Sequence, residues 1–135
     1  MKTSRHQHWF LTALLVGVVY FLIGRLFALP TDHLRAWRLA AWVASAAVYA
    51  AQLVYEYFRL GNSPRSTALH AATAVAVGGF GLALAATVHS WLVPSTTPPA
   101  QFLLALIVWP AATEIPAFLV AYVAVAVLAR LWPRV

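Results

Sequence analysis

Residues 101–131 read QFLLALIVWPAATEIPAFLVAYVAVAVLARL, an apolar run with one acidic residue, Glu114, between Pro110 and Pro116. At 1.5 Å per residue, a helix over this run is long enough to cross the ~30 Å hydrocarbon core of a bilayer. A carboxylate at that depth is costly unless it is paired, protonated or hydrated. The run therefore predicts a membrane span, with Glu114 as its candidate functional residue.

The composition of the whole chain is that of a protein in contact with lipid. Of its 135 residues, 63% are hydrophobic and 9% are charged, whereas soluble domains average about 45–50% and about 25%. The chain has no cysteine, which excludes disulfides, thiolate metal sites and cysteine nucleophiles. We predict an all-α polytopic membrane protein, a four-transmembrane-helix bundle with short loops in which residues 1–135 form a single domain.

Turn and cap residues divide the chain into the predicted spans. Asp32 is available to cap the second helix, Gly61 fits its C-terminal end, and Ser63 with Pro64 fits the start of the third. A signal peptide is the alternative interpretation of the first apolar run. The run is too long for the apolar region of a typical signal peptide and no clean cleavage site follows it, so a retained helix is favoured. The predicted spans cover about residues 9–29, 37–60, 66–93 and 101–131.

Basic residues predict the orientation, because cytoplasmic loops of membrane proteins carry an excess of Lys and Arg. With both termini inside (N-in, C-in), only Arg35 and Arg38 fall on the outer side. The net charge of +6 is scattered over helix ends and not clustered, so no nucleic-acid partner is predicted. The expected location is the bacterial cytoplasmic (inner) membrane. The cytoplasmic set comprises Lys2, Arg5, Arg59, Arg65, Arg130 and Arg134.

Polar and aromatic residues recur along one face of the second predicted span. Their alternating spacings of four and three residues match the helical repeat. Two interpretations are open: ordinary interhelical hydrogen bonding, in which Glu56 and Arg59 reach the cytoplasmic headgroups, or the polar lining of a site. The stripe consists of Arg38, Trp42, Ser45, Tyr49, Gln52, Glu56 and Arg59.

Each of the other spans contributes a feature near the same predicted depth as Tyr49. These are Tyr20, the glycines from Gly78 to Gly81, and Glu114. The glycines predict either close helix packing or space for water, a proton pathway or a small ligand. Arg25 either extends to headgroups or bends inward to pair with Glu114. The predicted ligand or ion site comprises Glu114, Tyr20, Tyr49, Gln52, Gly78, Gly81 and Arg25.

The histidines carry a weaker signal. His70 and His89 are placed at opposite ends of the third span, too far apart to bind one metal ion or haem together. An axial pair of His33 and His89 and simple hydration of interfacial histidines both remain open. We predict no catalytic residues, no bound metal and no cofactor.

Three functions follow from these predictions. The first is proton- or cation-responsive permeation or small-ligand binding centred on Glu114, in a homo-oligomer or a larger membrane complex. The alternative is a structural or accessory subunit. The third is a membrane enzyme acting on a lipid, which is the least favoured because no catalytic triad, phosphate loop or metalloprotease spacing is present.

Overall fold

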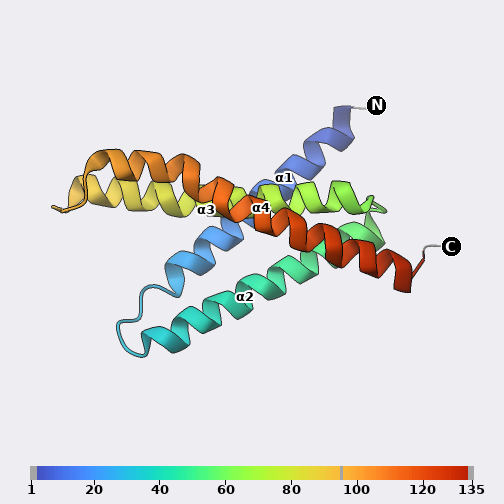
Figure 1. The fold of residues 1–135 in the computed structure, drawn as a ribbon, viewed down its shortest axis with the longest axis horizontal. Helices are drawn as coiled ribbons and strands as arrows, with labels where there is room; N and C mark the ends of the chain where they lie inside the picture. The colour runs from blue at the N-terminus through green and yellow to red at the C-terminus, as the bar shows by residue number, and fades with distance from the viewer. Residues whose placement is uncertain (1–2, 95, 134–135) are drawn as a thin grey trace.

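A computed structural model describes residues 3–94 and 96–133 of the protein (Figure 1). Within these residues the chain forms four α-helices: α1 (Thr3–Leu26), α2 (Leu34–Val54), α3 (Pro64–Leu92) and α4 (Pro99–Leu131). One π-helical turn, η1 (Tyr55–Arg59), continues α2. The predicted all-α bundle is confirmed. Lys2 and Arg134, which the orientation prediction used, lie outside the described residues.

Helix α3 is the centre of the bundle, with α4 beside it along its length and α1 packed on another face (Figure 1). Glycines allow both approaches. A Cβ atom added at Gly78 would lie 2.7 Å from the Cβ of Tyr20 on α1, and one added at Gly79 would lie 3.0 Å from the Oγ1 of Thr113 on α4. Small residues at such positions let helix backbones come close enough for extensive van der Waals contact.

Helices α1 and α3 run in the same direction. Trp9 stacks on His70 near their N-terminal ends, Gly17 meets Val77 further along, and Gly24 meets Leu82 beyond that. Because α1 and α3 run in the same direction, the connecting helix α2 has to run in the opposite direction over a similar distance. This arrangement agrees with the up-and-down order of a four-helix bundle.

The buried residues of helix α2, Gln52 and Leu53, both lie in its C-terminal half. Trp42 in its N-terminal half is 77% exposed, and the ends of α1 and α2 near their connecting loop lie apart from the α3–α4 hairpin (Figure 1). The core therefore lies at the opposite end, where η1 meets the other helices. Its buried residues are Leu53, Tyr57, Ala68, Ala71, Ala121 and Val125.

Three of the described helices are long and apolar enough to span a membrane: α1 over His8–Leu26, α3 and α4. Many of their leucine, isoleucine and valine side chains are exposed, as lipid contact requires. Helix α2 is not among them, since Arg35, Arg38 and Gln52 lower its hydropathy. The fold thus supports a membrane protein, whereas the four spans and the N-in, C-in orientation stay predictions.

Two of the three predicted helix ends are confirmed. Ser63 caps α3 by accepting the N–H of Ser66 at 3.2 Å, with Pro64 in the first turn. Gly61 adopts the left-handed conformation with φ 68°. The predicted cap Asp32 is wrong. The loop instead closes through His33, which has φ 56° and accepts the N–H of Ala36, so α2 starts one residue later than a cap at Asp32 requires.

Reporter fusions test the topology. If α2 crosses the bilayer, fusions after Pro64 and after Val135 will both be cytoplasmic, and one within residues 95–100 will be exported, because the basic residues favour the inner side. Paired alkaline phosphatase and fluorescent protein fusions measure this in bacteria. With an inner N-terminus but only three crossings, the fusions after Pro64 and Val135 would be exported and the middle one retained, which would overturn the four-span prediction.

Candidate functional site

The π-helical turn η1 sets the position of the central carboxylate of the site. The N–H of Leu60 donates to the carbonyl of Tyr55 at 3.3 Å, a five-residue step that inserts an extra residue into the last turn. Such turns are frequent at functional sites. Here η1 buries both Glu56 and Tyr57, and Glu56 is only 2% exposed. Glu56 is therefore not extended to the headgroups, but its contact with His70 on α3 agrees with the interpretation of interhelical hydrogen bonding.

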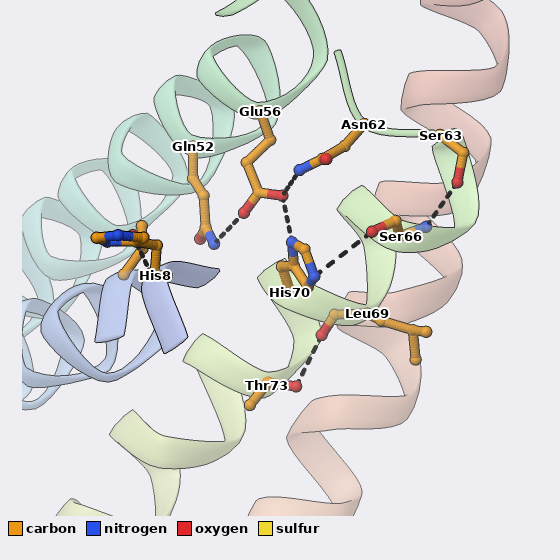
Figure 2. A network of polar contacts seen from close by, with 10 residues as sticks. His8, Gln52, Glu56, Asn62, Ser63, Ser66, Leu69, His70 and Thr73 are labelled. Carbon is orange, nitrogen blue, oxygen red and sulfur yellow. Dashed lines mark hydrogen bonds and ion pairs between the residues drawn. The ribbon is translucent and has the colours of Figure 1, made fainter. Parts of the chain in front are cut away.

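Three side chains surround the Glu56 carboxylate (Figure 2). The Nδ1 of His70 lies 2.6 Å from Oε2, and the amide of Asn62 donates to the same oxygen at 3.0 Å. The amide of Gln52 donates to Oε1 at 3.3 Å. Both carboxylate oxygens thus have partners, which is the condition under which a buried charge is tolerated.

The His70 imidazole is held on its other sides by α3 and α1. Its Nε2 lies 3.4 Å from the Oγ of Ser66, one turn earlier on α3. The ring of Trp9 stacks on it, with a centroid separation of 4.6 Å and an interplanar angle of 9°. The side chain of His70 is 14% exposed against 2% for that of Glu56. His70 is therefore the more accessible member of the pair.

This pair is a proton-binding group by its chemistry. A carboxylate with an imidazolium, or a carboxylic acid with a neutral imidazole, holds one proton and carries no net charge. Gaining or losing a proton leaves a net charge in a buried place, which is costly. Histidine is the residue type whose charge most readily changes near neutral pH. The contact between the carboxylate and the imidazole leads us to interpret the site as an acid–base pair.

The predicted residues Gln52, Tyr49 and Tyr20 lie inward of the pair. The hydroxyl of Tyr49, one turn before Gln52, donates to the carbonyl of Ala117 on α4. The hydroxyl of Tyr20 is close enough to Tyr49 to interact electrostatically. Within the part of the chain that the structure describes, the buried Oε1 of Gln52 and hydroxyl of Tyr20 have no hydrogen-bond partner. Of these three residues, Gln52 contacts Glu56 directly, whereas Tyr49 contacts α4.

The other predicted site residues are more dispersed. Glu114 is half-buried one turn before Ala117, and among residues 3–94 and 96–133 it has no hydrogen bond or ion pair. Gly78 and Gly81 face Tyr20 and Phe21 of α1. Arg25 is exposed at the end of α1.

No ion pair joins Arg25 to Glu114 in the described chain. The two residues belong to helices whose main contacts are with α3 and not with each other. Inward bending of Arg25 toward Glu114 is therefore not observed.

Sequence reasoning found Glu56 as part of the stripe but missed His70 as its partner. The usable signal was the short turn through Gly61 and Pro64, since residues a few positions before and after such a turn return to the same depth. No family model, curated protein or solved structure matches the chain. The function has to be argued from this geometry.

Proposed function

We propose that this chain is a small integral membrane protein that binds protons at the Glu56–His70 pair and passes them into a polar interior. The observation that carries the proposal is the 2.6 Å contact between a 2% exposed carboxylate and an imidazole that remains partly accessible. The proposal is a form of the proton-responsive permeation predicted from sequence.

The interior polar groups support a route beyond the pair. Gln52 contacts Glu56, and Tyr49 lies one turn before Gln52 on α2. Tyr20 of α1 is close enough to Tyr49 to interact electrostatically. The free acceptor of Gln52 and the free hydroxyl of Tyr20 are places where a water molecule would find partners. Glu114, one turn from the carbonyl that Tyr49 contacts, is the next titratable group on this route.

Exposed basic residues lie at the end of the proposed route where Glu56 and His70 are found. Arg59 and Arg65 are exposed on either side of the turn that carries Asn62 and Ser63. By the positive-inside rule this end is expected to face the cytoplasm. His70 would then exchange protons with the cytoplasmic side, and Glu114 would lie toward the middle of the membrane.

Proton flux into liposomes tests the proposal. The purified protein is reconstituted with an internal pH dye, and a potassium gradient with valinomycin supplies the driving voltage. We expect an initial rate several times that of protein-free liposomes for the native chain. Glu56→Gln and His70→Gln should return the rate to the protein-free level, because each removes one half of the proton-binding pair while keeping a similar shape.

Matched controls distinguish the loss of the Glu56–His70 pair from a general loss of folded protein. Asp32→Asn neutralises an exposed loop carboxylate and His8→Gln removes an exposed histidine, and both should leave the flux unchanged. Loss of flux in Glu114→Gln extends the route to Glu114, whereas retained flux means that the route does not pass through the Glu114 carboxyl. A native rate equal to that of empty liposomes, or a native-like rate in Glu56→Gln, would refute the proposal.

A second candidate function is that of an accessory subunit, and exposure along α2 favours it. Arg38 and Trp42 continue the stripe of Gln52 and Glu56, yet both lie exposed, with Trp42 77% exposed. A stripe of this kind fits a further helix, either of a second copy or of a larger complex. Its test is the size of the protein in mild detergent. Trp42→Ala should dissociate an assembly if this surface holds it, and a strictly monomeric native protein would contradict this candidate.

A further inference from the structure

An apolar groove runs between α1 and α3 toward the end of the bundle opposite to the Glu56–His70 pair. Its volume is about 650 Å³. Figure 1 shows the two helices separating toward the 27–33 loop. Gly17 and Gly81 form part of its floor, and valine, leucine and phenylalanine side chains form most of its walls.

The polar side chains of the groove are cationic or basic and lie at one end. Arg25, in the last turn of α1, and His89, near the C-terminal end of α3, are both in the lining. No acidic residue lines it. Both side chains are exposed, and in the described chain Arg25 has no ion-pair partner. An arginine at the edge of a membrane span needs an anion or water around its guanidinium.

We propose that this groove binds one anionic phospholipid, with an acyl chain along α1 and α3 and the phosphate at Arg25 and His89. Helix α3 lines it from Val77 to Leu92, about 22 Å at 1.5 Å per residue. One leaflet supplies about half of the ~30 Å hydrocarbon core, so the groove is long enough for a chain of ordinary length. Arg25 lies at the end of its span, at headgroup level.

Charge complementarity selects the lipid class. A phosphate beside a guanidinium forms strong charge-assisted hydrogen bonds, and the ring N–H of His89 adds a further donor. A zwitterionic lipid also carries a quaternary ammonium group, for which the lining offers no carboxylate. The lipid site is separate from the proton-binding pair and does not depend on it.

Native mass spectrometry of the full chain in mild detergent tests this site with two probes, phosphatidylglycerol and phosphatidylcholine. We expect one phosphatidylglycerol to be retained about fivefold more than phosphatidylcholine, the preference that one arginine near an anionic surface provides. Arg25→Gln should reduce that preference to near one. Arg130→Gln, which removes an exposed arginine at the end of α4, should leave it unchanged.

A pair of neighbouring alanines separates chain binding from charge. Ala85 lines the groove and Ala86 is exposed beside it. Ala85→Phe should lower retention of both lipids, and Ala86→Phe should retain both as the native chain does. Equal retention of the two lipids by the native chain, or an unchanged preference in Arg25→Gln, would overturn the proposal. So would a dimer that Ala85→Phe dissociates without any lipid adduct, because the occupant would then be a second copy.

Discussion

Replacing Glu56 by leucine is expected to lower the free energy of unfolding by about 3–5 kcal/mol, the usual effect of removing one partner from a buried charge pair. The variant leaves the His70 imidazole without its contact at 2.6 Å and the amides of Gln52 and Asn62 without their acceptor. The unpaired imidazole is the source of the lost stability. Equilibrium unfolding in mixed micelles measures it.

A double-mutant cycle isolates the pair. Glu56→Leu with His70→Leu should be more stable than the sum of the two single changes predicts, since the second replacement removes the group that the first leaves unpaired. Glu114→Leu is the matched control. Its carboxyl is half-buried without a hydrogen bond in the described chain, so its loss should be neutral or stabilising. Additive single changes, or equal costs at Glu56 and Glu114, would show that the pair contributes no coupling.

Much of the fold was predictable because helix periodicity and turn chemistry are local. Ser63 with Pro64 marked the start of α3, and Gly61 marked the turn before it. The cap at Asp32 was wrong because it depends on how the loop closes, which His33 decides through a left-handed backbone. The presence of one residue of a capping type does not determine the backbone conformation with which the loop closes.

The candidate site was predictable only in part. The helical phase of Gln52 and Glu56 predicted their common face, but a π-helical turn changes that phase after Val54, and nothing in local propensity announces it. The contact of Glu56 with His70 joins residues of different helices. Trp9 of a third helix, α1, stacks on the same imidazole.

Glu114 was predicted to be the functional residue because of its depth in a predicted membrane span. Counting residues from helix ends places a carboxyl in the membrane but does not reveal which carboxyl is enclosed. The structure encloses Glu56, at 2% exposure, on the helix with the weaker hydropathy. The role of Glu114 stays a prediction, and the flux assay with Glu114→Gln addresses it directly.

The second large expected effect is that of a substitution where α1 crosses α3. Trp9 and His70 meet only while these two helices pack closely. A Cβ at Gly17 would lie 2.5 Å from Cγ1 of Val77 and 2.9 Å from the backbone oxygen of Ala74, an obstacle that no rotamer change removes. Gly17→Val should therefore separate the helices and cost about 3 kcal/mol, the upper range for overpacking. Gly24→Val is the matched control, because its Cβ meets only the flexible end of Leu82 at 2.9 Å, and it should cost less than about 1 kcal/mol.

Unfolding in micelles measures the stability of both variants, and proton flux measures the consequence for the Glu56–His70 pair. Because α1 carries Trp9, Gly17→Val should also lower proton flux while Gly24→Val preserves it. Equal stability of the two variants would mean that close approach at Gly17 does not hold α1 against α3, and lost stability with full flux would mean that the proton-binding pair works without its Trp9 cover.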